Sequence, residues 1–259
     1  MVRTIIVTPA GRKQYLQKLL NHLLLQRDHF DEWHLWNNCQ GENEENLSKL
    51  EQEYDFIKVI HNSSLPRRKP HNFNVCRFYQ YAKDAGTIYI KLDDDIVWME
   101  PDFIKKLVQF RIENPEPFLV FGNVINNQIV NYIHQCGGLL QDLEILDYHC
   151  YGNLHRSKAN CIKLHKEFLE SRKAGNLDDW KFDRWELKDF EVCCINCVAW
   201  FGEKISIPRI KDELYFSHSV PKRRNTPNVI FGSAICVHLS YWKQRSPELE
   251  AMLDDISSV

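Results

Sequence analysis

The chain has 259 residues, 44% of them hydrophobic, which is enough to build the core of one large α/β domain. Its 33 Lys and Arg nearly balance 35 Asp and Glu, and the net charge of -2 argues against a chain-wide basic field of the kind that binds nucleic acid. The apolar part of residues 1–9 is too short for a signal peptide, and no run reaches the roughly 18 apolar residues of a membrane span. We therefore expect one cytoplasmic domain over residues 1–259, and a peripheral contact with a membrane remains open.

The first part of the chain alternates between strand and helix patterns. Short β-branched or apolar runs predict strands at residues 4–8, 32–36 and 56–60. Between them, helical spacing of apolar residues predicts a helix at 15–24, and a polar segment predicts another at 44–54. The order β-α-β-α-β predicts parallel pairing of the three strands.

A fourth strand, residues 87–92, follows a predicted helix at 72–83 and ends in three consecutive aspartates, residues 93–95. Burying an unpaired carboxylate costs several kcal/mol, so three carboxylates directly after an apolar run indicate a cation site. Oxygen ligands favour Mg2+ or Mn2+. In doubly wound sheets, ligands bind beyond the carboxyl ends of the strands, so Thr8, Asn37 and the three aspartates are expected to converge on one crevice.

The pattern changes in the second half of the chain. Residues 118–125 and 129–135 predict two strands of a hairpin, because Asn126 and Asn127 between them tolerate the positive φ of a tight turn. The aromatic segment 178–189 is a candidate acceptor platform, although packing on the surface is the favoured alternative. The remaining predicted elements are helices at 103–114 and 157–172, central strands at 192–201 and 229–238, and a terminal helix capped by Ser246.

The strand-end carboxylates suit chemistry in which a diphosphate leaves, because a bound metal neutralises the negative charge that develops. The sequence Leu92-Asp93-Asp94-Asp95 resembles the strand-end acidic motif of GT-A fold glycosyltransferases. The resemblance to this family covers most of the chain. The resemblance implies a single-domain α/β fold of the GT-A type. Residues 1–98 would form a Rossmann-like, nucleotide-binding half with a central, mostly parallel sheet. Residues 99–259 would form a mixed or antiparallel, acceptor-binding half with a C-terminal helix.

The same resemblance implies roles for individual residues. Asp95 would be the principal metal ligand, Asp93 would approach the ribose and share the metal, and His238 would complete the coordination of Mn2+ or Mg2+. A core histidine hydrogen-bonded to backbone is the alternative for His238. Asn37 stands where such enzymes often have an Asp that contacts the base. The residues expected to contact the nucleotide are Thr8, Pro9, Arg12, Asn37, Arg77, Lys91, Asp93 and Asp94, and further candidates for phosphate binding are Arg67, Arg68, Lys69, Lys222, Arg223 and Arg224.

A sugar hydroxyl becomes a good nucleophile only as a base removes its proton. Asp212-Glu213 resembles the late acidic pair of inverting members, and Glu213 is favoured over Asp212 as the base. The two carboxylates are otherwise explained as a pair at a helix N-terminus. The implied reaction transfers a sugar, with inversion, from a nucleotide-diphosphate sugar to a saccharide, glycolipid or glycoprotein acceptor.

Three other functions compete with this interpretation. Asp93-Asp94-Asp95-Ile96-Val97 also satisfies the D-x-D-x-V pattern of haloacid-dehalogenase-type phosphohydrolases, with Asp93 as the nucleophile, but that pattern normally follows the first strand of its domain. A nucleotidyltransferase would need a glycine-rich first loop, which residues 9–12 do not provide. A catalytically inactive module that binds a nucleotide sugar is the non-enzymatic alternative.

Overall fold

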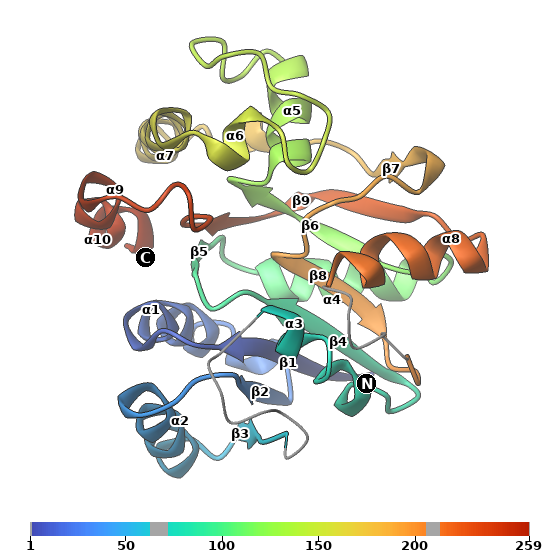
Figure 1. Ribbon diagram of the computed structural model, residues 1–259. Helices are drawn as coiled ribbons and strands as arrows, with labels where there is room; N and C mark the ends of the chain where they lie inside the picture. Colours follow the sequence, from blue (N-terminus) through green and yellow to red (C-terminus); the bar gives the residue numbers. More distant parts are fainter. Residues whose placement is uncertain (1, 63–71, 206–212, 259) are drawn as a thin grey trace.

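The computed structural model describes residues 2–62, 72–205 and 213–258, and the chain forms a mixed α/β fold around one nine-stranded sheet (Figure 1). The strands are β1 (Arg3–Ala10), β2 (Glu32–Asn37), β3 (Ile57–Ile60), β4 (Thr87–Leu92), β5 (Ile96–Met99), β6 (Val120–Ile125), β7 (Trp185–Leu187), β8 (Cys197–Phe201) and β9 (Asn228–His238). The α-helices are α1 (Lys13–Leu24), α2 (Glu42–Glu53), α3 (Asn72–Val75), α4 (Phe103–Glu113), α5 (Gln128–Cys136), α6 (Asn153–Arg156), α7 (Lys158–Lys173), α8 (Val220–Arg224), α9 (Pro247–Ala251) and α10 (Leu253–Ser257).

The first half of the chain forms the expected parallel sheet. Strand β1 pairs in parallel with both β2 and β4, and β2 pairs in parallel with β3. Alternate residues of a strand point to opposite faces, and β1 buries both faces. Ile6 packs with Leu16 and Leu20 of α1, whereas Ile5 packs on the other face with Trp36. The predicted Rossmann-like arrangement of this half is confirmed.

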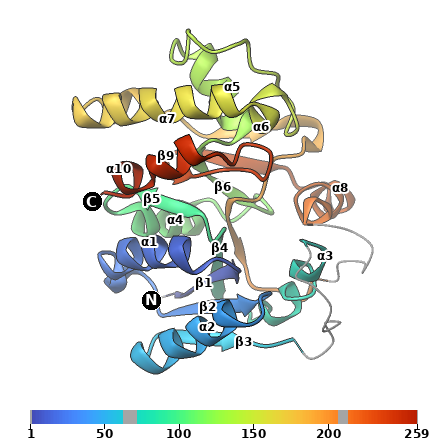
Figure 2. The same cartoon turned by 60° about the vertical axis from the view of Figure 1, so that its left-hand side comes forward.

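The second half extends the same sheet with mixed pairing. Strand order is β3-β2-β1-β4-β8-β6-β9-β5, with β7 beside β9. Strand β8 runs antiparallel to β4 and β6, while β6 and β9 are parallel. Helices α5 to α7 lie at the end of the molecule opposite α2 and β3, and the C-terminal helices lie beside β5 and α7 (Figure 2). The expected change from a parallel to a mixed sheet is confirmed.

The predicted hairpin at 118–135 is wrong in its second strand, because residues 128–136 form helix α5. The side chain of Asn127 accepts hydrogen bonds from the backbone N–H groups of Ile129 and Val130, at 3.2 and 3.4 Å. These contacts satisfy donors that the first turn of a helix leaves unpaired. Asn126 does adopt the expected positive φ of 72°. The turn therefore leads into a helix rather than a returning strand.

Two other boundaries differ from the prediction. Residues 72–83 form only α3 and a short 3-10 helix at Tyr79–Tyr81, and the strand predicted at 192–201 begins at Cys197. The backbone at 189 and 190 has positive φ, at 51° and 57°. These two residues precede the predicted strand. Strand β8 begins at Cys197 because Cys197 pairs with Leu92, the last residue of β4, and residues 192–196 lie beyond the end of that strand.

Within the described residues, no helix is both long and apolar enough to cross a membrane. Eight of the nine cysteines are buried, and Cys136 alone is exposed. This confirms that most of the cysteines are core residues.

Candidate active site

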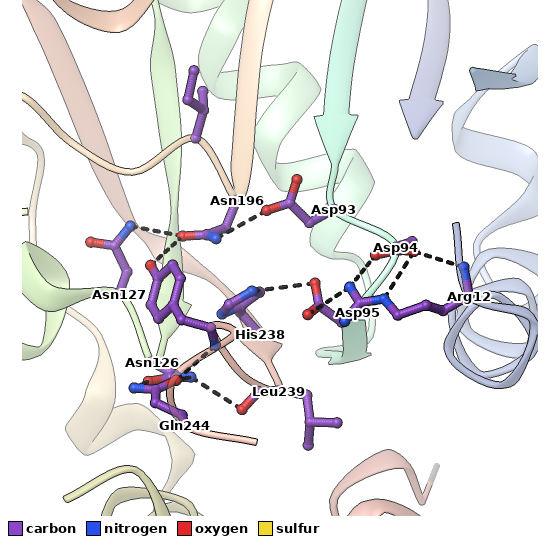
Figure 3. A network of polar contacts seen from close by, with 12 residues as sticks. Arg12, Asp93, Asp94, Asp95, Asn126, Asn127, Asn196, His238, Leu239 and Gln244 are labelled. Atoms are coloured by element: carbon purple, nitrogen blue, oxygen red, sulfur yellow. Dashed lines mark hydrogen bonds and ion pairs between the residues drawn. The ribbon is translucent and has the colours of Figure 1, made fainter. Parts of the chain in front are cut away.

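The aspartate triplet forms the turn between β4 and β5, at the carboxyl end of the parallel strands (Figure 3). Strands β1, β2 and β4 are parallel, so their carboxyl ends meet at this edge of the sheet, as expected for a crevice. Ile96, which follows the triplet, pairs with His238 at the carboxyl end of β9. This pairing brings together two segments that are far apart in the sequence.

Asp93, Asp95 and His238 form a cluster that can hold a metal ion. One potential ligand atom from each residue lies within 4.8 Å of the others. Nε2 of His238 lies 3.2 Å from Oδ1 of Asp95, and among the described residues Nδ1 of His238 has no hydrogen-bond partner. Two carboxylates suit Mg2+ or Mn2+, and an imidazole ligand is more typical of a transition metal. The donor set therefore fits a divalent metal and favours Mn2+ over Mg2+.

Arg12 is the counter-ion of the triplet. Its guanidinium forms an ion pair with Asp94 and lies 2.9 Å from Oδ2 of Asp95, and its backbone N–H donates to Asp94 at 3.0 Å. Burial alone would lower the pKa of Arg12, but the two carboxylates outweigh this effect and raise it. We expected Arg12 and Asp94 to contact the nucleotide. The two side chains pair with each other inside the site, and contact of either with a nucleotide remains a prediction.

Asp94 and Asp95 are both buried, but their surroundings shift their pKa values in opposite directions. Burial raises the pKa of Asp94, although Arg12 opposes the increase. Burial would also raise the pKa of Asp95, but His238 and Arg12 hold it well below its usual range. Asp95 is therefore ionised, as a metal ligand must be.

Lys91 is a buried cation that joins both sides of the site. Its Nζ donates to Oδ1 of Asp93 at 2.5 Å and to the carbonyl of Ile195 at 2.6 Å, and it lies 3.3 Å from Oε1 of Glu213. Burial would lower the pKa of Lys91, but the two carboxylates outweigh burial and raise it. All three donors of the Lys91 ammonium have partners within the protein, and contact of Lys91 with a nucleotide remains a prediction.

Glu213 lies close enough to Asp93 to share a counter-ion with it. Its Oε1 accepts a hydrogen bond from the hydroxyl of Tyr79 at 2.7 Å. The same oxygen forms the ion pair with Nζ of Lys91. The side chain is 20% exposed, so part of it is accessible to solvent. Burial raises the pKa of Glu213, and Lys91 opposes that increase. Asp212, the other candidate base, lies outside the described residues.

Asn196 is a residue of this site that the sequence did not reveal. Its Nδ2 donates to Oδ2 of Asp93 at 3.0 Å, while its Oδ1 accepts from Tyr241 and Asn127 at 2.9 and 3.2 Å (Figure 3). The ring of Tyr241 is centred 4.6 Å from that of His238. The one indication in the sequence was that Asn196 is a polar residue within an apolar run, directly before β8.

Several residues predicted to face the nucleotide have partners within the protein. Thr8 is buried inside β1, where its hydroxyl accepts a hydrogen bond from the indole of Trp33 at 3.0 Å, and Pro9 also lies within that strand. Asn37 ends β2 as expected, and its Nδ2 donates to Glu44 at 2.8 Å. Contact of Thr8, Pro9 or Asn37 with a nucleotide remains a prediction.

The predicted basic groups are spread over several regions. Arg77 follows α3 and its carbonyl accepts from Asn62 at 3.2 Å, whereas Arg224 forms an ion pair with Glu203. The guanidinium of Arg223 lies 5.1 Å from the ring centre of Tyr215. A phosphate contact by Arg77 or by Lys222 remains a prediction. Three basic residues lie outside the described residues, namely Arg67, Arg68 and Lys69.

No protein-family model matches this chain. No curated protein matches it either. Among solved structures, 4-diphosphocytidyl-2C-methyl-D-erythritol synthase from Anaerococcus prevotii DSM 20548 is similar at 17% identity and a TM-score of 0.32, over 46% of this chain and 53% of that one. CMP:2-keto-3-deoxy-manno-octonic acid synthetase complexed with CTP is similar at 14% identity and a TM-score of 0.34, over 46% and 52%. The chain spans about half the length of these two proteins, and likeness of this degree does not specify a reaction.

Proposed function

We propose that this protein is a metal-dependent glycosyltransferase that moves a sugar from a nucleotide-diphosphate sugar to an acceptor hydroxyl with inversion. The observation that carries the proposal is the meeting of two groups at one edge of the sheet. The first is the cluster of Asp93, Asp95 and His238, and the second is Glu213, which Lys91 links to Asp93. A cation site beside a partly exposed carboxylate matches what this reaction needs.

Asp93, Asp95 and His238 would hold Mn2+ or Mg2+. When bound, the metal would neutralise the negative charge that the leaving diphosphate acquires. His238 and Arg12 keep the pKa of Asp95 low, and the contact with Arg12 orients its carboxylate. Asn196 and Lys91 each hydrogen-bond one oxygen of Asp93, which fixes the plane of its carboxylate.

Glu213 is the proposed general base. The oxygen of the acceptor hydroxyl forms a bond to the anomeric carbon, and the proton of that hydroxyl passes to the carboxylate of Glu213. The bond between that carbon and the diphosphate oxygen breaks, and the electron pair leaves with the diphosphate. A base works best when its pKa is near the operating pH, and burial moves the pKa of Glu213 upward in that direction.

The test combines ligand binding with turnover. Thermal unfolding is measured with Mn2+ and each of UDP, GDP, CDP and ADP, and nucleotide release is then measured with the matching nucleotide sugars. We expect one nucleotide diphosphate to stabilise the fold, by about 2.7 kcal/mol at a hundredfold excess over its Kd. Asp95→Asn should abolish the metal-dependent part of this shift. Glu213→Gln should keep the shift and lower turnover by roughly 100-fold to 10,000-fold.

Two results would contradict the proposal. If no nucleotide diphosphate stabilises the protein and it hydrolyses p-nitrophenyl phosphate in an Asp93-dependent way, the protein is a phosphohydrolase with Asp93 as its nucleophile. If Glu213→Gln turns over normally, Glu213 is not the base and Asp212 takes its place as the candidate.

A further inference from the structure

A pocket of about 260 Å³ opens beside the segment that carries Glu213. Its volume is just below the roughly 300–1,000 Å³ of sites for drug-sized ligands, so it suits a small ligand such as one sugar ring. Among the residues that the structure describes, no Asp, Glu, Lys or Arg side chain lines it. Its described lining residues are His149, Cys150, Tyr151, Val192, Leu214, Tyr215, His218 and Ser219.

One wall of the pocket continues directly from the proposed base. Leu214 and Tyr215 follow Glu213 in the chain, and the N–H of Phe216 donates to the carbonyl of Glu213 at 2.9 Å. This hydrogen bond closes a helical turn, which holds Tyr215 in a fixed relation to Glu213. A ligand in the pocket would therefore lie next to the segment that presents the base.

A second wall is connected to the proposed metal ligand His238 through a series of neighbouring aromatic rings. The ring of Tyr151 is centred 5.3 Å from that of His155, which is 4.0 Å from the ring of Tyr241. Tyr241 in turn lies 4.6 Å from His238. The wall at Tyr151 is thus linked ring by ring to the proposed metal site, while the wall at Leu214 and Tyr215 adjoins the proposed base.

The third wall is tied to the segment that holds Asp93. Val192 lines the pocket, and Sγ of Cys194 donates to the carbonyl of Cys150 at 3.5 Å. The next residues, Ile195 and Asn196, contact Lys91 and Asp93. Two of the walls therefore belong to segments that also build the proposed reaction centre, and the wall at Tyr151 reaches it through aromatic rings.

The chemistry of the walls favours a neutral ligand with both apolar and hydroxyl surfaces. The rings of Tyr151 and Tyr215 offer apolar faces together with polar hydroxyls. Nδ1 of His218 lies 2.6 Å from the carbonyl of Phe190, so Nδ1 carries a proton, and in the neutral ring Nε2 is then a hydrogen-bond acceptor. The hydroxyl of Ser219 both donates and accepts. A sugar ring has apolar C–H faces and a rim of hydroxyl groups that match these features.

We propose that this pocket binds the acceptor, and that the acceptor is a neutral saccharide. This inference rests on the proposed glycosyltransferase function, because it assigns the second substrate of that reaction. It favours a neutral sugar over a sugar acid, since no Lys or Arg side chain of the described part of the chain lines the pocket.

The test uses saturation-transfer NMR with Mg2+ present. The probes are the methyl glycosides of glucose, galactose, mannose and N-acetylglucosamine, with methyl glucuronide as the acidic comparison. Ser219→Trp fills the pocket, and the matched control is Ser48→Trp, on the exposed face of α2. We expect at least one neutral glycoside to bind the natural protein. Its signal should fall at least fivefold in Ser219→Trp and stay unchanged in Ser48→Trp.

The outcomes separate this inference from the function it rests on. If a nucleotide diphosphate stabilises the protein with Mn2+ but no neutral glycoside binds, or if the glucuronide binds better, the pocket assignment is wrong and the glycosyltransferase proposal stands. If glycosides bind and no nucleotide diphosphate does, the glycosyltransferase proposal fails. If circular dichroism shows that Ser219→Trp is unfolded, Tyr215→Ala takes its place with the same fivefold criterion. An unchanged signal in the folded variant overturns the assignment.

Discussion

Asp93 shows how much of this site depends on single side chains outside the aspartate triplet. Its Oδ1 is held by Lys91 and its Oδ2 by Asn196. Lys91 is completely buried and also contacts Glu213, so one cation sets the distance between a proposed metal ligand and the proposed base. Asn196 holds the other oxygen of Asp93 through a neutral amide, so its replacement removes a hydrogen bond without removing a charge.

We expect Asn196→Ala to weaken Mn2+ binding by roughly 10-fold to 100-fold, the usual effect of removing a group that orients a metal ligand. The carboxylate of Asp93 would lose one of its two fixed contacts, and the hydroxyl of Tyr241 would lose its acceptor. Isothermal titration with MnCl2 measures the change. Asn21→Ala, at an exposed position of α1, is the matched control and should bind as the natural protein does. Equal affinities in the two variants would show that Asn196 does not position Asp93.

At the scale of elements, the residue that caps the start of α5 also contacts the loop of the candidate active site. The Oδ1 of Asn127 caps this helix, while its Nδ2 donates to the carbonyl of Cys194 at 3.1 Å and to Asn196 at 3.2 Å. The same side chain thus begins a helix and supports the loop that reaches Asp93. A sequence pattern shows the capping residue but does not show the loop that it contacts.

Asn127→Ala should lower the free energy of unfolding by about 2–4 kcal/mol. A lost cap costs about 1 kcal/mol, and a buried carbonyl left without its donor adds about 1–3 kcal/mol. Urea denaturation measures the loss. Ser246→Ala removes a cap from α9, where Oγ accepts from Leu249 at 3.3 Å, and should cost only about 1 kcal/mol. If the two variants lose the same stability, the contacts of Asn127 beyond its helix contribute nothing.

At the scale of the whole molecule, stability should depend on pH through buried neutral histidines. Nε2 of His134 lies 2.9 Å from the carbonyl of Trp180, and its Nδ1 accepts from Asn131 at 3.0 Å. Both contacts suit the neutral ring. Burial lowers the pKa of His134 to about 4, against about 6.5 for an unfolded chain. The unfolded state therefore binds a proton more readily than the folded state.

It follows that the stabilising effect of a neutral His134 is complete above pH 6.5 and is lost as the pH falls from about 6.5 to about 4. Within this range, His134 alone should lower the free energy of unfolding by up to about 1.4 kcal/mol per pH unit. Urea denaturation at pH 7, 6 and 5 measures the slope, and His134→Gln should have a shallower one. Identical slopes for the two proteins would show that His134 is not the titrating group.

The sequence predicted the order of strands and helices in the first half, because this information is local. Period-2 and period-3.6 patterns identify each element from its own residues, and the β-α-β-α-β order leaves parallel pairing as the natural result. The same reasoning placed residues 93–95 at the end of a strand, where the structure has them. It could not anticipate α5, since Ile129 and Val130 fit a strand as well as a buried helix.

By itself the sequence determined that carboxylates gather at a strand end and that a late histidine follows another strand. Only the tertiary structure decided which groups neutralise them. Arg12 became the partner of Asp94, and Asn196 became the partner of Asp93 from 103 positions away. The strand order β1-β4-β8 brings these segments side by side. Charges separated in the sequence interact only after the sheet has formed, and for this reason local patterns indicate candidate metal ligands but not the residues that hold them.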